Sequence, residues 1–227
     1  MLDSVSEGCY EAPRAAALSG VPLSTVYHWA RTGVVTPTVS HVRERLWSYA
    51  DLLALRVVSW LRHPKASDGV VVGASSMASV REALEFAAAG GVDFWEAGGD
   101  NAAASGLRVD RTGRVWVVMP SGELLDAAGD STLELEGPYL DLLAPFEQEH
   151  ARGPHLLVPR PDLRIVPAKV AGEPHVVGSR ITTRNLAALA RRGFGSVAIA
   201  DMYGIALSAV DQAVELESQL APATVAA

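Results

Sequence analysis

The segment from Leu52 to Leu61 constrains the fold of this chain more than any other part of the sequence. It reads Leu-Leu-Ala-Leu-Arg-Val-Val-Ser-Trp-Leu, so a helix over these residues is apolar around nearly its whole circumference. Ser48 and Asp51 have the spacing of a capping box and predict that the helix starts there and runs to about Arg62. One small module cannot cover such a helix. We therefore expect another domain or another subunit to pack on part of it.

Two short helices are expected ahead of this segment. Helix start and stop signals favour one helix from Tyr10 to Gly20 and a second from Pro22 to Arg31, which Gly33 closes. The second helix places apolar residues on one side and polar residues on the other. Two short helices joined by a tight turn, the second with a polar face, are typical of a helix-turn-helix.

The stretch from Val34 to Trp47 follows these helices and is rich in residues that favour strands. His41, Arg43 and Arg45 alternate along it, and a strand would place all three side chains on the same side. We therefore expect a strand or wing with one basic face beside the second helix.

Residues 16–29 (AALSGVPLSTVYHW) and 43–53 (RERLWSYADLL) resemble the winged helix-turn-helix of the MerR superfamily. That resemblance implies a second helix in the major groove of DNA and a wing that holds phosphates or the minor groove. The DNA-binding residues that it implies are Ser24, Thr25, Tyr27, His28, Arg31, His41, Arg43 and Arg45. The alternative is a helical hairpin whose polar face is only solvated. Because so few cations are available, one copy would bind weakly, and we expect a homodimer.

Charge is distributed unevenly along the chain. The formal net charge is −7; residues 65–155 net −9, whereas residues 1–64 and residues 156–227 each net +1. The two ends can approach a phosphate backbone, and the middle would be repelled by one. The acidic middle is better suited to steering a basic protein partner.

The middle of the chain predicts a small α+β domain. Residues 64–69 indicate a linker and residues 70–72 a strand, and Ser76 or Ser79 is expected to cap a helix that ends at Ala89. From residue 107 to residue 125, short strand-like pieces alternate with turn signals. This pattern predicts an antiparallel meander.

The last part of the chain predicts a β-hairpin followed by three helices. The segment from 161 to 181 holds short strand-like pieces separated by Gly172-Glu173-Pro174. Thr182 or Thr183, Ser196 and Ser208 are expected to cap helices that end at Arg192, Tyr203 and Leu220. A glycine turn at Gly204 before the last helix again indicates a helix-turn-helix.

This segment resembles the prokaryotic family called domain of unknown function 433, on its hairpin and its Gly-x-Pro-x-x-x-Gly-Ser-Arg-Ile sequence at residues 172–181. Members of that family are often VapB-type antitoxins encoded beside a PIN-like ribonuclease toxin. The resemblance implies a toxin-binding role for the positive group of this part, with Arg180 the leading candidate. The group consists of Arg180, Arg184, Arg191 and Arg192. Contact with DNA and pairing with the chain's own acidic middle remain alternatives.

The last helix carries Asp211, Glu215 and Glu217 and no basic residue, so it is poorly suited to face phosphates. We expect it to touch a protein or to pack in a dimer. The residues expected to pack in that dimer are Val210, Ala213, Val214 and Leu220.

Signatures of catalysis are missing from the sequence. The histidines do not share a helix at ligand spacing, and no phosphate-binding glycine loop or nucleophile elbow occurs. Asp93, Glu96 and Asp100 suggest a metal nuclease, but no fourth ligand motif accompanies them. We expect no enzyme, no cofactor and no metal. The single cysteine, Cys9, and the lack of a signal peptide or a membrane span in the sequence predict a cytoplasmic protein.

These features together predict an α+β, mainly α protein in three parts. Residues 1–64 form a MerR-like winged helix-turn-helix, residues 65–155 an acidic α+β domain, and residues 156–227 a module of the domain of unknown function 433. The expected function is that of a type II antitoxin that inhibits a PIN-like ribonuclease toxin and represses its own operon by binding operator DNA. The alternative is a MerR-like transcription regulator without a toxin, whose middle domain senses a ligand.

Overall fold

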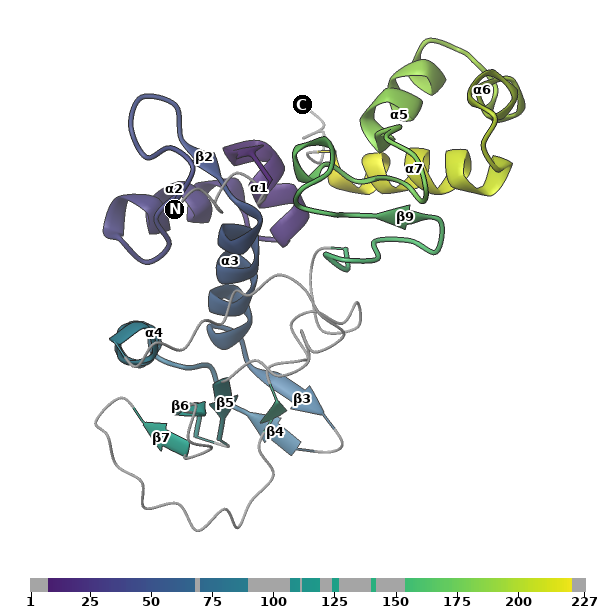
Figure 1. Cartoon of the computed structure of the whole chain (residues 1–227). Helices are drawn as coiled ribbons and strands as arrows, with labels where there is room; N and C mark the ends of the chain where they lie inside the picture. The colour runs from purple at the N-terminus through teal and green to yellow at the C-terminus, as the bar shows by residue number, and fades with distance from the viewer. Residues whose placement is uncertain are drawn as a thin grey trace, which may run out of the picture.

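The structure is a computed structural model that describes residues 8–67, 70–89, 107–110, 112–118, 124–126, 140–141 and 154–221. Over these residues the protein has an α+β fold that is mainly helical (Figure 1). Below, the N-terminal region is 8–63, the middle region comprises the described residues between 64 and 141, and the C-terminal region is 154–221. No single helix among the described residues is long and apolar enough to cross a membrane; one bent pair, Ser196–Tyr203 with Leu207–Leu220, meets that test by length and composition only.

The N-terminal region begins with a short strand and two helices. Strand β1 (Tyr10–Glu11) leads into α1 (Ala12–Ser19), and α2 (Leu23–Thr32) follows after a turn at Gly20. Gly20 has the left-handed φ of 73° and closes α1 as expected. The first helix starts two residues later than the sequence predicts, because Tyr10 and Glu11 instead pair with strand β2 (Leu46–Trp47).

Of the strand or wing expected at 41–45, the strand is wrong. Only the two residues of β2 form a strand in this stretch, and Ser40 adds one isolated bridge to Leu46. His41, Arg43 and Arg45 lie in a loop between them. The short partner strand β1 explains this result, since a two-residue strand can pair with no more than a two-residue ladder.

Helix α3 (Tyr49–Leu61) has the predicted capping box at its start. The backbone N–H of Asp51 donates to Ser48 Oγ over 3.1 Å, and the backbone N–H of Ser48 donates to Asp51 Oδ2 over 2.8 Å. Burial raises the pKa of Asp51, although the hydrogen bonds from Thr38 and Ser48 act in the opposite direction.

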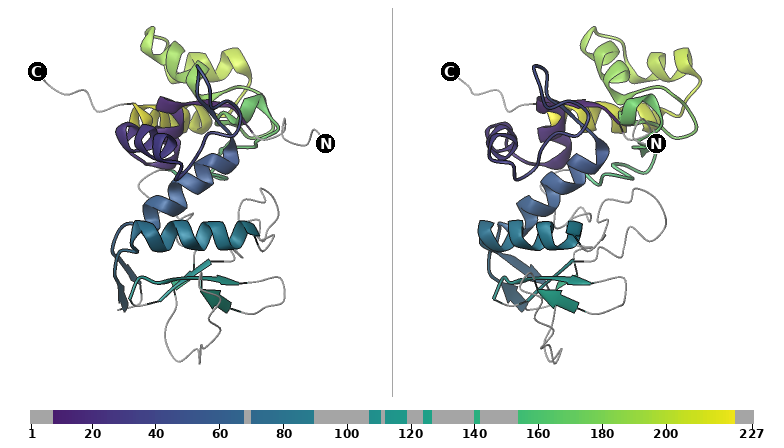
Figure 2. Two further views of the ribbon diagram at one scale, coloured as in Figure 1. Left: turned by 90° about the vertical axis from the view of Figure 1, so that its left-hand side faces the viewer. Right: turned by 60° about the vertical axis from the view of Figure 1, so that its left-hand side comes forward.

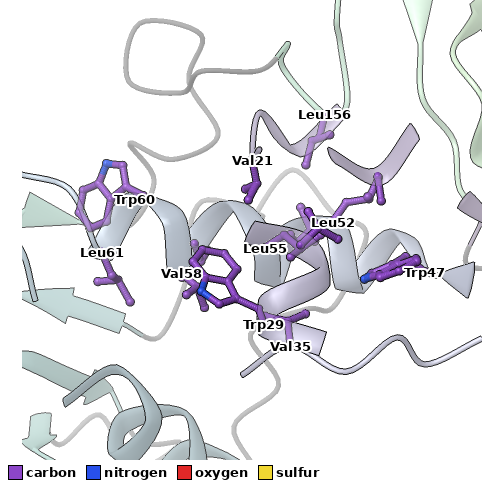
Figure 3. Packing of buried hydrophobic residues seen from close by; sticks show 14 of the residues in the cluster. Val21, Trp29, Val35, Trp47, Leu52, Leu55, Val58, Trp60, Leu61 and Leu156 are labelled. Atoms are coloured by element: carbon purple, nitrogen blue, oxygen red, sulfur yellow. The ribbon is translucent and has the colours of Figure 1, made fainter. Parts of the chain in front are cut away.

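Other parts of the same chain cover α3, as its apolar circumference predicts. Leu52, Leu55 and Leu61 on this helix are fully buried, and Leu156 from the C-terminal region packs in the same cluster (Figure 3). Val80 of the middle region belongs to that cluster as well. The helix therefore joins all three regions of the chain into one core.

The described middle region holds a two-stranded sheet, a four-stranded sheet and one helix. Strand β3 (Lys65–Ser67) pairs antiparallel with β4 (Val70–Val72), so the expected linker at 64–69 contains a strand. Helix α4 (Met77–Ala89) lies across the four-stranded sheet (Figure 2), and Ser76 rather than Ser79 accepts the capping hydrogen bond. The expected metal candidates Asp93, Glu96 and Asp100 lie outside the described residues.

The predicted antiparallel meander is confirmed. Its strands are β5 (Leu107–Val109), β6 (Val115–Val118) and β7 (Leu124–Asp126), and β8 (Leu140–Asp141) adds an edge strand that the sequence did not indicate. The order in the sheet is β7-β6-β5-β8.

The C-terminal region contains a small strand pair and three helices. Strand β9 (Leu163–Arg164) pairs antiparallel with β10 (His175–Val176), and the 3-10 turn η3 (Val170–Gly172) lies between them. Helices α5 (Thr183–Arg191), α6 (Ser196–Tyr203) and α7 (Leu207–Leu220) follow. Their own small core is built on Leu186, Ile199, Val210 and Leu216.

Two of the predicted helix caps in this region are wrong. Ser196 is the first residue of α6, and the capping position is Gly195. Ser208 lies inside α7, where its hydroxyl donates to Asp162 Oδ2 over 2.6 Å. Helix α6 starts at Ser196 itself and α7 starts one residue ahead of Ser208, so neither hydroxyl stands at the capping position.

Candidate functional site

Helix α2 presents the expected polar face to solvent. Val26 and Trp29 are buried against the rest of the N-terminal region, which forces the opposite side of the helix outward. Thr25 is half-buried, and the other candidates on this helix are exposed: Ser24, Tyr27, His28 and Arg31. The five candidate DNA-binding residues of this helix therefore lie on its accessible part.

The loop before β2 lies beside this helix. A groove of about 540 Å³ runs between the loop, α2 and the start of α1, and it is lined by Tyr27 from α2 and by Arg43 and Arg45 from the loop. His41 is exposed in the same loop but does not line the groove. The structure thus brings Tyr27 together with two of the three predicted loop cations, although that loop is not a strand.

The charge of this groove is mixed. Glu11 and Glu44 line it together with Arg43 and Arg45, so carboxylates offset the attraction that the two arginines exert on a phosphate. Among the described residues, no carboxylate lies within salt-bridge distance of Arg31, Arg43 or Arg45. The guanidinium groups of this surface are accordingly available to a ligand.

The second arginine group lies on the C-terminal region. Arg180 follows the turn at Gly178, which has a left-handed φ of 73°, and is exposed. Arg191 and Arg192 are exposed at the end of α5. Arg184, whose side chain is 58% exposed, lies 3.6 Å from Glu173 in a weak ion pair.

Only part of this second group is brought together. Arg184 and Arg191 line one groove of about 250 Å³ between α1, α5 and α7, together with Arg14 and Glu217. Arg180 and Arg192 do not line it. The four arginines therefore do not share one pocket.

Two of the residues expected to form a dimer contact on α7 lie inside the protein. Val210 and Ala213 are fully buried in the core of the C-terminal region, and Val214 and Leu220 pack partly buried against it. The expectation that Val210 and Ala213 meet a second copy is therefore wrong, since α5 and α6 already cover the apolar side of α7.

A polar junction that the sequence analysis does not predict joins α1 to the C-terminal region. The buried Arg14 guanidinium donates to Glu173 Oε2 over 2.7 Å and to Glu217 Oε1 over 2.7 Å. The hydroxyl of Thr183 donates to the same Glu217 oxygen. Burial acts to lower the pKa of Arg14, but the two carboxylates outweigh it and raise that pKa above its ordinary value.

Backbone contacts extend this junction. The hydroxyl of Tyr10 donates to the carbonyl oxygen of Gly172 over 2.7 Å, and the N–H of Cys9 donates to that of Ala171 over 2.9 Å. Val170, Ala171 and Gly172 have successive left-handed φ values of 46°, 55° and 78°. Such a conformation is strained for valine and alanine, and it turns two carbonyls of the loop toward β1.

The one cation in the apolar helix α3 is Arg56, which is buried and hydrogen-bonded to backbone carbonyls. Its guanidinium donates to the carbonyl oxygens of Leu18 and Pro154, each over 2.6 Å, and to that of Ser19 over 3.3 Å. Leu18 and Ser19 end α1, whose last carbonyls have no partner inside the helix. Burial lowers the pKa of Arg56 to about 10. The side chain therefore remains a cation that fastens the end of α1 and the start of the C-terminal region to α3.

Among the described residues, no group of three or more histidine, cysteine, aspartate or glutamate side chains is arranged to hold a metal ion.

Comparison with known proteins places few constraints on this chain. No protein-family model matches it, and no curated protein matches it. Its structure is similar to the X-ray crystal structure of Rv2018 from Mycobacterium tuberculosis, with a TM-score of 0.49 and 16% sequence identity over 90% of this chain and 96% of the other.

Proposed function

We propose that this protein is a DNA-binding antitoxin of a type II toxin-antitoxin system. It binds and inhibits a PIN-like ribonuclease toxin, and as a dimer it represses its own operon. In this proposal α1, α2 and the loop before β2 are a winged helix-turn-helix of MerR type. The C-terminal region is a module of the domain of unknown function 433.

The observation that carries the DNA-binding part is the polar face of α2, which is exposed beside a loop that holds Arg43 and Arg45. Side chains at the start of a helix of this kind reach base edges, while cations in a neighbouring loop reach phosphates. Arg31 is the one arginine on this helix and lies in its last turn, where it suits a phosphate rather than a base.

The toxin-binding part is supported by the exposed arginines of the C-terminal region. Among them, Arg180 directly follows the turn at Gly178 and Ser179. A guanidinium can form two parallel hydrogen bonds with a carboxylate, the group that divalent-metal nucleases use to hold their ions. Inhibition in this mechanism is occlusion, since Arg180 would occupy carboxylates of the toxin and no bond is made or broken.

Operator binding is tested with the duplex upstream of this protein's own gene, labelled and titrated in a fluorescence anisotropy experiment. The proposal expects tighter binding to this duplex than to one of unrelated sequence. Arg31→Ala should weaken binding to both duplexes. Equal affinity for the two duplexes in the unaltered protein would contradict a role as an operon repressor.

Toxin inhibition is tested with the product of the adjacent reading frame, whose ribonuclease activity is measured against increasing amounts of this protein. The proposal expects activity to vanish at a stoichiometric ratio. Arg180→Ala should raise the amount needed at least tenfold, while Arg81→Ala, an exposed arginine on α4, should not change it. An adjacent product without ribonuclease activity, or one that does not co-purify, would favour the transcription regulator without a toxin.

A further inference from the structure

Five large apolar side chains are exposed on one part of the C-terminal region. They come from the turn after α5, from α6 and from the start of α7, and Val197 and Met202 are the most exposed, at 62% and 55%. The members of this apolar patch are Phe194, Val197, Met202, Tyr203 and Leu207. Figure 1 shows α6 at the end of the C-terminal region that lies away from α1 and α2.

The sequence of α6 explains why this surface is apolar. Ile199 and Ala200 are buried in the core of the C-terminal region, so the inward side of the helix is already used. Val197 and Met202 are nevertheless apolar on the outward side. A surface helix normally carries polar residues there, and a group of exposed apolar residues marks a surface that another molecule covers.

The backbone around the patch is open. Phe194 lies between Gly193 and Gly195, and a Cβ atom added at either glycine would meet nothing within 4 Å. The same is true of Gly204 at the end of α6. No described part of the chain crowds these three positions, so a second molecule can approach closely.

Charged residues of both signs lie close in sequence to the members of the patch. Arg192 stands two residues ahead of Phe194 on one side. Asp201 follows Val197 by one helical turn, and Asp211 follows Leu207 by one helical turn, so each aspartate lies on the same side as its apolar neighbour. Among the described residues none of these three charged groups has a salt-bridge partner.

We infer that the apolar patch is the surface through which two copies of this chain associate. A two-fold interface places the same patch on both sides, so apolar residues meet apolar residues without a separate partner surface. The rim is self-complementary in charge, because Arg192 of one copy can face Asp201 or Asp211 of the other. An entirely basic or entirely acidic partner would be repelled by one side of this rim.

This inference rests on the dimer in the proposed function and assigns its surface. It replaces the buried α7 residues Val210 and Ala213 with exposed ones. The C-terminal dimer would then hold two copies of α2, whose combined cations are needed for useful affinity toward DNA. The arginine expected to reach the toxin first, Arg180, precedes α5 and is not a member of the patch.

The full-length protein and two single variants test the inference by sedimentation velocity at micromolar concentrations. The unaltered protein should be a dimer. Val197→Asp should make it a monomer, because a carboxylate would be buried in the interface without a partner. Val71→Asp is the matched control, since Val71 is 71% exposed on β4, at the other end of the molecule in Figure 1, and should remain a dimer. A monomeric unaltered protein, or a dimeric Val197→Asp variant, overturns the inference.

Cross-linking provides a second test that does not depend on destabilising the interface. In a Cys9→Ser background, which removes the chain's single cysteine, Val197→Cys should give a covalent dimer with a short bismaleimide, and Val71→Cys should not. Equal cross-linking of the two variants would contradict the assignment.

Toxin inhibition by the same variants separates this inference from the proposed function. Val197→Asp should inhibit the toxin at the same ratio per chain, while its affinity for operator DNA falls at least tenfold. If the unaltered protein is a monomer and Val197→Asp loses toxin inhibition, the patch belongs to the toxin instead. If toxin inhibition is absent throughout and Val197→Asp still dissociates the dimer, the interface holds and the proposed function fails.

Discussion

Arg14 on α1 and Glu217 on α7 form a buried ion pair across 203 residues of sequence, with guanidinium and carboxylate 2.7 Å apart. The two side chains are 8% and 9% exposed. Glu173 completes the arrangement, so one cation faces two carboxylates. The first helix of the DNA-binding candidate is thereby fixed to the region that carries the toxin-binding candidates.

Arg14→Ala should destabilise the protein by about 3–5 kcal/mol, because Glu173 and Glu217 would be left buried without their cation. Chemical denaturation measures this loss. Arg184→Ala, which removes the exposed partner of the same Glu173, is the control and should cost no more than about 1 kcal/mol. Equal losses for the two variants would mean that burial of the pair contributes nothing.

Arg56→Met should also destabilise the protein strongly, by about 3 kcal/mol or more. The methionine would fill much of the volume but leave the carbonyl oxygens of Leu18, Ser19 and Pro154 without a donor. Arg62→Met, at the exposed end of the same helix, removes one hydrogen bond to Ser75 and should cost about 1 kcal/mol. Urea denaturation of the two variants measures both losses of stability. A smaller loss for Arg56→Met than for Arg62→Met would contradict the role of Arg56 in fastening α1 and Pro154 to α3.

Gly172→Ala should destabilise the protein more than Gly178→Ala. Both glycines have left-handed φ values, so each substitution carries a backbone cost of about 1–2 kcal/mol. At Gly172 an added Cβ would also clash with the hydroxyl of Tyr10, whereas at Gly178 it would meet nothing within 4 Å. Thermal unfolding compares the two, and Tyr10→Phe combined with Gly172→Ala should recover part of the additional loss. If the double variant recovers no stability, the close approach to Tyr10 is not the cause of the additional loss at Gly172.

Folding should depend on the protonation of His175. Burial lowers the pKa of this imidazole below its ordinary value of 6.5, and its Nδ1 lies 2.9 Å from the carbonyl oxygen of Glu173. Because the unfolded chain binds a proton more readily, the stability contributed by His175 is complete above pH 6.5. It falls as the pH drops from there through the folded pKa. An NMR titration, with the signal assigned by its loss in His175→Gln, should give a midpoint below 6.5. A midpoint above 6.5 would mean that protonation of His175 stabilises the folded protein instead of destabilising it.

Salt dependence separates phosphate contacts from other effects of the loop cations. Arg43→Ala and Arg45→Ala should each reduce the slope of log affinity against log salt by about 0.9, the value for one phosphate contact on duplex DNA. Glu44→Gln should strengthen binding, because it removes a carboxylate from the groove that these arginines line. Unchanged slopes in both arginine variants would place DNA elsewhere on the protein.

Local signals in the sequence predict much of the fold. The capping box of Ser48 and Asp51, the αL residue Gly20 and the alternation from residue 107 onward all depend on neighbours within a few positions. The exposed face of α2 followed from helical periodicity in the same way. Helix start and stop signals likewise put Arg184 near the start of α5 and Arg191 at its end.

What the sequence does not predict depends on partners far away along the chain. Alternation at 41–45 suggests a strand, yet only the short β1 is available to pair. Arg14 and Glu217 each read as surface charges, because nothing within a few positions of either indicates the other. One signal was available for Arg56, since a lone arginine in an apolar helix must find polar partners when that helix is buried.

Arg56 on α3 donates hydrogen bonds to the carbonyl oxygens of both Leu18 and Pro154. The chain, which leaves α3 at Arg62, therefore contacts that helix again at Pro154. The polypeptide between these two points is therefore an insertion in an otherwise continuous body built from the two ends. Lengthening or exchanging that insertion would leave the attachment of α1 to α7 intact. Homologues can thus be expected to vary most in this stretch while retaining the arginine that closes it.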